Sequence, residues 1–431
     1  MFWNERIAIV DGLRSPFVKS WSTLNGIDPV ELSTHVTREL LFAKNIDMQS
    51  VDQIVWGTVV SVPRSPNVAR EVALNLGMYK TPGFTISRAC ASGFQSIASA
   101  AESLWMGHAN IAVAGGVDVT SNAPVPHKKT VIDKLRDLPR AGTWKKLSTI
   151  ASLRPSDFFP VPPEISERFT GKTMGEHAED MAKYFGISRA EQEELAIHSH
   201  QKASNAMKQG WIDKQITPIF NDKNPIKKER KLVATDNIVR SDMQIEKLQK
   251  MKPVFDRKNG TITAATSSAL TDGASAVLLM RESTAKALGY TPKGYIKSYA
   301  FPALDPRENM LLGNVYSCPI ALDRAKLSLQ DIDVVEIHEA FAAQVLCNVR
   351  CFEDDTFFQE KLGRDKALGA LDMDKLNIWG SSLAYGHPFA ATGGRMIINM
   401  LHILEQTGGN FGLATACAAG GLGAAMIIER G

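Results

Sequence analysis

The sequence lacks any long hydrophobic run: no uncharged apolar stretch in its 431 residues approaches the roughly 18–20 residues that span a bilayer. Its amino terminus also lacks the basic start and the extended apolar core of a secretory signal peptide. Cysteine is scarce, and an odd number of scattered residues does not suit a disulfide framework. The five cysteines are Cys90, Cys318, Cys347, Cys351 and Cys417. We therefore expect a soluble protein of the cytoplasm.

Neither sign of charge dominates the chain. Lys and Arg number 49 against 46 Asp and Glu, a formal net charge of +3, which is too small to predict a nucleic-acid-binding protein. Hydrophobic residues make up 44% and charged residues 22% of the sequence, the balance of a protein with a full hydrophobic core. This composition excludes intrinsic disorder, and the length predicts two or three compact units.

Strand-like apolar runs alternate with helical patterns, which predicts an α/β architecture. A weak internal repeat indicates two similar halves: residues 50–57 resemble residues 331–338, and residues 273–279 resemble residues 423–428. The intervening region is richer in Lys, Arg and Pro and looks like an insertion carried by the first half. We expect a first half made of residues 1–121 and 251–283, a loop domain of residues 122–250, and a second half of residues 284–431.

Four short segments each place a reactive side chain just after a predicted strand, where open α/β sheets bind their ligands. These reactive residues are Cys90, His338, His387 and Cys417. Cys90 also begins a predicted helix, whose dipole and free backbone N–H groups stabilise a thiolate and so lower the thiol pKa. Gly93, in the first turn of this helix, permits a close backbone approach. Position alone leaves Cys90 as either a nucleophile or a small buried hydrophobic residue.

The two histidines and the second cysteine are weaker signals when each is taken singly. His387 lies in a Gly-His-Pro turn and could be the base that activates a thiol. A lone histidine is more often a hydrogen-bonded structural residue, and the same alternative applies to His338. Cys417 precedes a glycine-rich run, which suits a turn close to a ligand or a buried cysteine beside a tight hairpin.

Together, the four segments resemble the four catalytic motifs of the thiolase family, in the same order and over essentially the whole chain. The nucleophile motif corresponds to residues 90–94, the Asn-Glu-Ala-Phe motif to 338–341, the Gly-His-Pro motif to 386–388 and the Cys-x-Gly motif to 417–419. The resemblance implies an α/β thiolase fold, in which two similar halves pack in a five-layer αβαβα arrangement with an inserted loop domain. It also implies an acyltransferase that cleaves a 3-ketoacyl-CoA with CoA, giving acetyl-CoA and a shortened acyl-CoA.

Two departures from the family's motifs are informative. His338 stands where many thiolases have asparagine, which resembles the thiolase subunits of the trifunctional complexes of fatty-acid β-oxidation. Residues 159–163, 255–261 and 381–393 resemble the same subgroup. Ala419 replaces a glycine whose backbone N–H helps to form an oxyanion hole, and alanine keeps that N–H. The subgroup implies a homodimer within a heterotetramer, whose α subunit carries hydratase and 3-hydroxyacyl-CoA dehydrogenase activities.

The resemblance implies a role for each residue of the site. Cys90 is the nucleophile that forms the acyl-enzyme, and His387 is its base. The backbone N–H groups of Cys90 and Ala419 form the oxyanion hole. His338, through a water, polarises the thioester oxygen together with His387, and Cys417 gives a proton to the enolate and takes one from the incoming CoA.

Coenzyme A is implied as a substrate, and no bound cofactor is expected. Met174 and Ser268 match family positions along the pantetheine chain of CoA. We expect no metal site. His198 and His200, two residues apart on a predicted helix, point to different faces. His338 is not followed by a second histidine at zinc-protease spacing.

Two basic stretches carry further expectations. The first, in residues 127–168, forms either a solvated helical surface or a docking face for a partner subunit or an anionic membrane. The second, in residues 227–231, either meets the phosphates of CoA or lies on a surface loop. Their basic residues are Lys128, Lys129, Lys134, Arg136, Arg140, Lys145, Lys146, Arg154 and Arg168, and then Lys227, Lys228, Arg230 and Lys231.

Two other functions remain open. A decarboxylating ketoacyl synthase uses one cysteine and two histidines on a similar architecture, and Cys90, His338 and His387 would serve it. The Cys417 segment and the large insertion argue against this alternative. A non-enzymatic lipid carrier would bind acyl-CoA without turnover and leaves the four motifs unexplained. The second substrate separates the two enzymes, because a thiolase uses free CoA and the synthase uses a malonyl thioester.

Overall fold

The computed structural model describes residues 5–125, 127–136, 138–154, 157, 159, 166–224 and 231–431. Its main element is a ten-stranded sheet in the order β10-β11-β12-β9-β1-β8-β5-β3-β4, with β2 paired to β8, and β6 and β7 form a separate small sheet. The strands are β1 (Ile7–Arg14), β2 (Val18–Lys19), β3 (Gln53–Gly57), β4 (Gly83–Ile86), β5 (Ile111–Val119), β6 (Ile219–Asn221), β7 (Lys231–Val233), β8 (Thr271–Arg281), β9 (Gly294–Ala300), β10 (Val334–Ile337), β11 (Phe411–Ala418) and β12 (Leu422–Arg430).

The two halves of the main sheet repeat the same pairing pattern, which confirms the two similar halves predicted from the internal repeat. In the first half β3 is parallel to β5, β5 is antiparallel to β8, and β8 is antiparallel to β1. In the second half β10 is parallel to β11, β11 is antiparallel to β12, and β12 is antiparallel to β9. The halves join where β1 pairs with β9, so they form one continuous hydrogen-bonded sheet.

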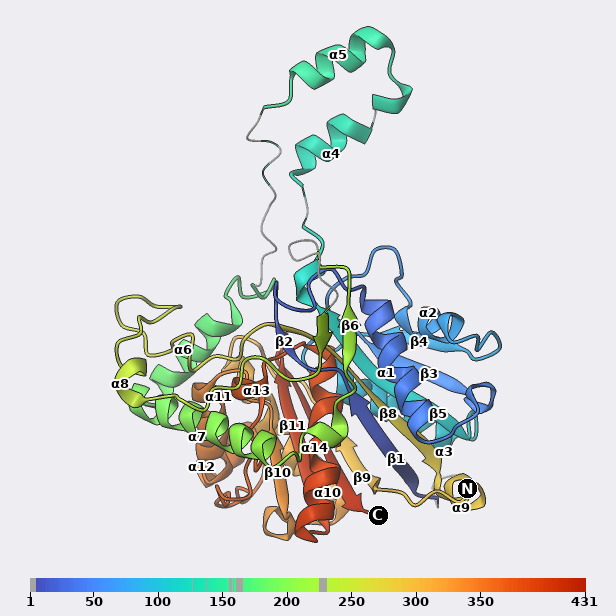
Figure 1. The fold of residues 1–431 in the computed structure, drawn as a ribbon. Helices are drawn as coiled ribbons and strands as arrows, with labels where there is room; N and C mark the ends of the chain where they lie inside the picture. Colours follow the sequence, from blue (N-terminus) through green and yellow to red (C-terminus); the bar gives the residue numbers. More distant parts are fainter. Residues whose placement is uncertain are drawn as a thin grey trace.

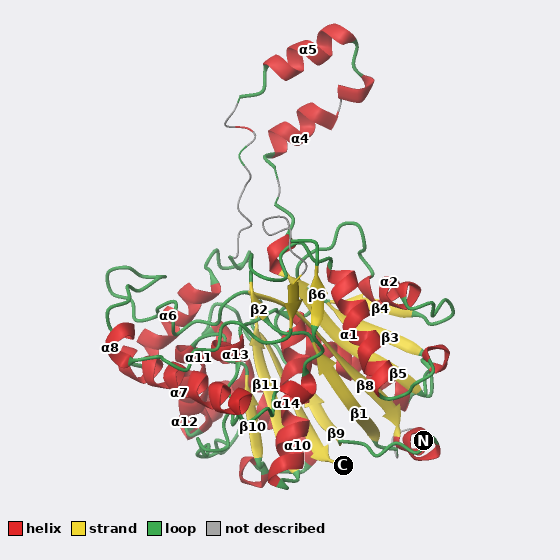
Figure 2. Cartoon of the chain, in the orientation of Figure 1, coloured by secondary structure: helices red, strands yellow, loops and turns green. Residues whose placement is uncertain are grey.

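Helices complete the five layers expected of the fold (Figures 1 and 2). Helices α1 and α2 pack against strands of the first half, and α10 packs against β9, β11 and β12 of the second. Between the halves lie α3 and α14, and α14 contacts β5 and β8 on one side and β10 and β11 on the other. The helices are α1 (Pro29–Ala43), α2 (Val68–Asn75), α3 (Ser92–Trp105), α4 (Lys129–Arg136), α5 (Thr143–Ala151), α6 (Met174–Tyr184), α7 (Arg189–Lys208), α8 (Ile245–Leu248), α9 (Glu282–Ala287), α10 (Gly313–Ala325), α11 (Ala342–Phe352), α12 (Asp355–Phe357), α13 (Ser382–Tyr385) and α14 (Ala390–Thr407).

The two central helices approach each other closely through glycine. A Cβ on Gly93 of α3 would lie 2.5 Å from the carbonyl oxygen of Ala390 and 3.1 Å from Gly393 Cα, both in α14. Only glycine allows this distance without moving a backbone, as expected for Gly93. The contact brings the start of α3 against the start of α14, and the residues just before each of these helices, Cys90 and His387, belong to the candidate site.

The region between the halves has two structurally different parts. Helices α6 and α7 pack against α11, and α7 also packs against α13. Helices α4 and α5 instead project away from the body as an arm, here defined as residues 127–136 and 138–154 (Figure 1). Within the described residues no helix combines the length and apolarity needed to cross a membrane.

Candidate active site

Cys90 lies in the tight connection between β4 and α3, as the sequence predicts. Ala89 adopts a positive φ of 45°. The hydroxyl of Ser92 accepts a hydrogen bond from the Arg88 N–H at 2.7 Å and donates to the Ala89 carbonyl oxygen at 2.7 Å. These bonds fix the turn, so the thiol is held just before the first residue of α3.

The expectation of a lowered pKa for this thiol is wrong. Burial raises the pKa of Cys90 to about 11, and the buried carboxyl of Asp118 raises it further, although the backbone N–H groups of Ala419 and Cys90 oppose the shift. Desolvation disfavours the charged thiolate more than these donors favour it. The resting nucleophile is therefore a neutral thiol that needs a base.

His387 lies in the loop between α13 and α14 rather than after a strand, which corrects the prediction of its local structure. Its backbone N–H donates to the Ala269 carbonyl oxygen at 2.9 Å, and its Nδ1 lies 2.7 Å from Thr392 Oγ1. Its Nε2 is buried without a hydrogen-bond partner among the described residues. Phe389 packs edge-on against the ring at 5.0 Å.

His338 follows β10, as predicted, and is fully buried. Its backbone N–H donates to the Thr415 carbonyl oxygen at 2.9 Å, which fixes the residue beside β11. Its Nδ1 lies 2.8 Å from Ser382 Oγ, and in the described part of the chain its Nε2 also has no partner. In both histidines, therefore, Nδ1 is hydrogen-bonded to a hydroxyl group, and Nε2 has no hydrogen-bond partner among the described residues.

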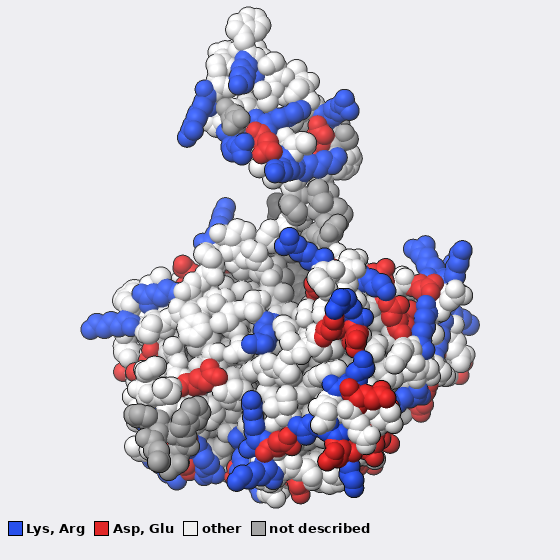
Figure 3. Space-filling model, turned by 180° about the vertical axis from the view of Figure 1, so that it is seen from behind, with Lys and Arg blue, Asp and Glu red and all other residues white. Residues whose placement is uncertain are grey.

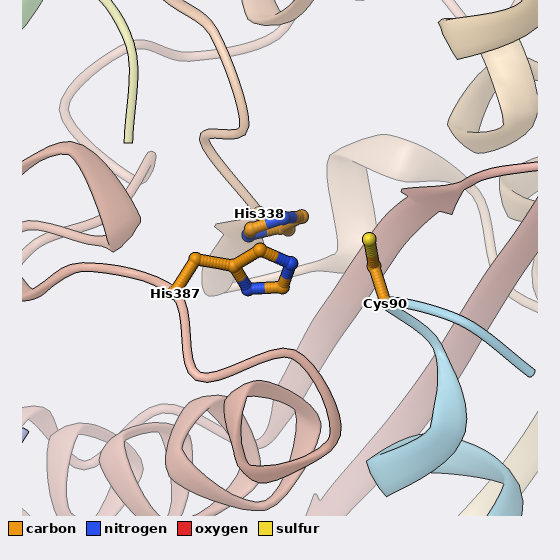
Figure 4. A group of neighbouring side chains, drawn as sticks. All are labelled: Cys90, His338 and His387. Carbon is orange, nitrogen blue, oxygen red and sulfur yellow. The ribbon is translucent and has the colours of Figure 1, made fainter. Parts of the chain in front are cut away.

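The structure brings Cys90, His338 and His387 together (Figure 4). Each offers one donor atom, and these atoms lie within 4.8 Å of one another. Burial and the nearby Arg395 lower the pKa of His387 to about 3. Burial, His387 and Arg395 hold the pKa of His338 well below its ordinary value. Both rings are thus neutral at physiological pH. Cysteine sulfur and histidine nitrogen are also the ligands that zinc prefers. The expectation that the protein has no metal site therefore stays a prediction.

Cys417 is the fourth predicted residue and lies near the end of β11. It is buried, and burial together with the neighbouring Cys90 thiol raises its pKa. The following turn takes its positive φ angles at Gly420 (80°) and Gly421 (68°), and Ala419 is not in that region. Alanine is therefore compatible with the backbone there, and its N–H favours the thiolate of Cys90, opposing the rise in the pKa of that thiol.

Two buried carboxyl groups hold the loops of the site, and no sequence pattern predicts the role of either. Glu339 Oε2 accepts from Ser199 Oγ at 2.7 Å and from the Leu383 N–H at 3.1 Å, which ties the His338 loop to α7 and α13. Asp118 accepts from the backbone N–H groups of Val59, Val60 and Ala390 at 2.7–2.9 Å. Asp118 thus joins the end of β5 to the first residue of α14, and burial raises its pKa to about 7.

A cavity of about 580 Å³ opens beside the site, and Ser268 lies in its wall. The segment that carries Ser268 connects both histidine loops. Ser268 N–H donates to the Ala340 carbonyl oxygen at 2.9 Å, and Leu270 forms an isolated bridge with His387. The wall also contains the charged residues Lys19, Arg240, Asp242 and Lys247.

The other residues predicted to contact CoA are placed differently. Met174 is not part of this wall; it is half-buried and packs against the core cluster that includes residues of α11. Its neighbour Gly175 lies against the ring of Phe255, which does line the cavity. Lys231 is exposed on β7 and is not in the wall. Lys227, Lys228 and Arg230 lie outside the described residues, as do residues 160–163 of the subgroup resemblance.

Family comparisons agree with this arrangement. Residues 7–283 match the model of the thiolase N-terminal domain, and residues 290–430 match the thiolase C-terminal domain. The chain belongs to the thiolase family. Curated relatives cover 99% of this chain and 97% of their own length. The 3-ketoacyl-CoA thiolase of Pseudoalteromonas atlantica is 49% identical to it, and that of Alteromonas mediterranea is 50% identical.

Solved thiolase structures have the same fold. The crystal structure of Bacillus anthracis acetyl-CoA acetyltransferase matches with a TM-score of 0.84 and 31% identity, over 99% of each chain. Human mitochondrial 3-ketoacyl-CoA thiolase matches with a TM-score of 0.83 and 28% identity, also over 99% of each chain. Its complex with CoA matches with a TM-score of 0.82 and 28% identity, over 99% of this chain and 98% of that one. The predicted thiolase fold is confirmed.

Proposed function

We propose that this thiolase is a 3-ketoacyl-CoA thiolase, an acetyl-CoA C-acyltransferase that shortens 3-ketoacyl-CoA substrates in fatty-acid β-oxidation. The observation that carries the proposal is the proximity of two cysteines, the half-buried Cys90 and the buried Cys417, at a site that already contains two neutral histidines. Thiolysis needs a nucleophile and a separate group that moves protons twice, and two cysteines with two histidines supply both.

The first half-reaction forms an acyl-enzyme. His387 Nε2 accepts the Cys90 proton, and the thiolate attacks the 3-keto carbon of the substrate. The backbone N–H groups of Cys90 and Ala419 stabilise the tetrahedral oxyanion, and their approach to the Cys90 sulfur supports this role. Collapse of this intermediate breaks the carbon–carbon bond and leaves the acyl group on Cys90. The leaving group is the enolate of acetyl-CoA.

Two further proton transfers complete the reaction: the enolate must be protonated, and the incoming CoA thiol must be deprotonated. His338 and His387 polarise the thioester oxygen of the enolate, and Cys417 gives a proton to its carbon. Cys417 then accepts the thiol proton of an incoming CoA, whose thiolate takes the acyl group from Cys90. The Cys90 thiolate that leaves regains its proton from His387. The raised pKa of Cys417 suits this exchange, because the group must be a thiol in the resting enzyme in order to donate.

We assign the cavity beside the site to coenzyme A. Ser268 is well placed to contact the pantetheine chain, because its backbone N–H bonds to the loop that follows His338. Lys19, Arg240 and Lys247 in the same wall supply positive charge for phosphates. Met174 stays a proposed pantetheine contact. Its support is indirect: the next residue, Gly175, packs closely on Phe255, and Phe255 lines the cavity.

The test of the proposed function is thiolysis of 3-ketoacyl-CoA substrates of increasing chain length with free CoA. The wild type should cleave them, faster for longer chains. Cys417→Ala should lose roughly 10²- to 10⁴-fold in turnover, the usual contribution of one acid–base group. Cys347→Ala, which removes a buried thiol in α11, is the matched control and should remain active. If no chain length is cleaved with CoA, the thiolase function is wrong and the synthase and carrier functions, which the comparisons do not favour, must be tested.

Association with a second copy is supported by the edge of the main sheet. Within the described strands β4 pairs only with β3, and Phe84 in β4 is 38% exposed. An open edge with an exposed aromatic is a surface for strand pairing. We propose a homodimer, within a heterotetramer that also contains a hydratase/3-hydroxyacyl-CoA dehydrogenase α subunit. Purification of the native protein without a second subunit would count against this assembly.

The arm supports peripheral contact with an anionic membrane. Its apolar side chains are exposed at spacings of three residues, which places them together on one side of each helix. They are Ile132 and Leu135 in α4, and Trp144, Leu147 and Ile150 in α5. Several Lys and Arg side chains lie on the same arm (Figure 3), which favours a negatively charged lipid surface. We propose a cytoplasmic protein that meets the membrane through this arm.

Sedimentation with vesicles tests the membrane contact. The wild type should bind vesicles that contain anionic lipid and not neutral ones. Replacing Trp144 and Leu147 with serine should abolish binding. Phe42→Ser, which removes a side chain that is 79% exposed on α1, should have no effect. The arm would instead be a subunit interface if two results were found together. The wild type would bind the purified α subunit but not vesicles, and the arm variant would lose the binding to the α subunit.

A further inference from the structure

We propose that Ser382, held by Arg395, fixes the tautomer of His338, so that His338 Nε2 carries the proton and faces the reaction centre as a hydrogen-bond donor. Ser382 and Arg395 are then positioning residues, which act on the reaction through His338. The inference rests on the proposed function for its catalytic consequence, whereas the tautomer itself can be measured without turnover.

The first step concerns the Ser382 hydroxyl. Its oxygen lies 2.8 Å from His338 Nδ1, and it accepts a hydrogen bond from Arg395 Nη2 at 3.3 Å. A guanidinium only donates, so that bond occupies a lone pair and leaves the hydroxyl proton free to donate. Within the described residues, His338 Nδ1 is the one acceptor recorded for this proton. Nδ1 of His338 is therefore an acceptor.

The second step concerns the other nitrogen of the same ring. A neutral imidazole has one N–H and one acceptor nitrogen, and burial beside Arg395 keeps His338 neutral. With Nδ1 accepting, the single proton is on Nε2. This Nε2 is buried and has no protein partner in the described part of the chain, so its N–H is available to a substrate oxygen.

The third step explains why Arg395 stays in place. Arg395 is fully buried, and its Nη1 lies 3.5 Å from Glu336 Oε2. Its Nη2 also donates to Ser381 Oγ at 3.0 Å. Glu336 lies on β10, two residues before His338, which follows the strand. The carboxyl that faces Arg395 and the ring that Arg395 influences therefore belong to one short segment of the chain.

The two histidines then divide the chemistry through opposite tautomers. His387 can take the Cys90 proton at Nε2 only if its own proton is on Nδ1, and Thr392 Oγ1 at 2.7 Å is the acceptor for that proton. Thr392 and Arg395 both lie on α14. One helix therefore supplies the hydroxyl that makes His387 an acceptor and the guanidinium that makes His338, through Ser382, a donor.

The experiment compares Ser382→Ala with Ser381→Ala. Ser381 is the matched control, because it is equally buried and also accepts from Arg395, whereas among the described residues only Ser382 hydrogen-bonds to the His338 ring. Ser382→Ala should lower kcat by about 10- to 100-fold, less than the loss of a whole oxyanion donor, with the KM for CoA unchanged. Ser381→Ala should lose much less. Alkylation of Cys90 by iodoacetamide should be equally fast in both, since it needs no donor at His338.

Nitrogen NMR of enzyme labelled with ¹⁵N-histidine reads the tautomer directly. The His338 signals are assigned by their loss in His338→Gln. The wild type and Ser381→Ala should show His338 protonated at Nε2, and Ser382→Ala should show a mixture of tautomers. A proton on Nδ1 in the wild type, or equal loss of kcat in the two serine variants, would overturn the proposal. An inactive wild type with the Nε2 tautomer would instead refute the proposed function and leave the hydrogen-bond assignment standing.

Discussion

The imidazole rings of His338 and His387 lie 4.1 Å apart, centroid to centroid, with 40° between their planes. One ring follows a strand of the second half and the other precedes the central helix α14. Two protonated rings at this distance would repel each other, and the lowered pKa values of both keep them neutral. Neutrality lets one ring accept a proton while the other donates a hydrogen bond.

The pH dependence of Cys90 alkylation tests the neutral resting state. Because the pKa of the thiol is raised to about 11 and that of His387 is lowered to about 3, the reactive thiolate is a small fraction at neutral pH. This fraction should grow tenfold per pH unit. We expect the alkylation rate with iodoacetamide to rise with a slope of about 1 in log units between about pH 7 and 9.

A control separates Cys90 from the other thiols. Cys90→Ser should remove the modification, as detected by mass spectrometry of the intact protein. A rate that is already constant from about pH 6 would mean that a thiolate–imidazolium pair exists before substrate binds, and the assignment of a neutral thiol would then be wrong.

The charged residues of the cavity wall should control the affinity for CoA. Replacing Arg240 and Lys247 with alanine removes two cations from the wall, and the KM for CoA should rise about tenfold or more, as expected for lost charge-assisted hydrogen bonds. The kcat should change little. Neutralising Lys227, Lys228, Arg230 and Lys231 is the comparison. If the fourfold variant raises the KM for CoA more than the double variant does, the CoA phosphates bind at residues 227–231, which is one of the two interpretations of that basic stretch.

Gly93→Ala should disturb the contact between the central helices. The added Cβ would lie 2.5 Å from the Ala390 carbonyl oxygen, so a backbone must move, and we expect a loss of about 1–3 kcal/mol in the free energy of unfolding. Gly142→Ala in the arm is the control, because its Cβ meets nothing within 4 Å. Urea denaturation measures both variants, and equal stabilities would show that the helices can separate without cost.

The buried histidine His402 should contribute to acid sensitivity. Burial first, and then Lys293, lower its pKa to about 4. Its contribution to stability is therefore fully present above the unfolded pKa of about 6.5 and is lost as the pH falls towards 4. In that range His402→Gln should flatten the pH dependence of the unfolding free energy by up to about 1.4 kcal/mol per pH unit. The exposed His108→Gln is the control, and identical slopes in all three proteins would contradict the assignment.

The sequence by itself determined the features that depend on local pattern. The alternation of strands and helices and the repeat of residues 50–57 at 331–338 predicted the two halves. The start of α1 is equally local, because the Asp28 side chain accepts from the N–H groups of Val30 and Glu31 and Pro29 opens the helix. The order and spacing of the four motifs named Cys90, His338, His387 and Cys417 as candidates, because each motif is a short turn or strand end that its own residues specify.

Only the tertiary structure decided the chemical state of those residues. The Cys90 thiol has a raised pKa because distant segments bury it, whereas the local helix start alone predicted the opposite. Asp118 and Arg395 act on the site from β5 and α14, and no local pattern marks them. The proton positions on the two rings follow from hydroxyls at Ser382 and Thr392. A pKa and a tautomer depend on desolvation and on neighbours in space, and these are fixed only when the chain has folded.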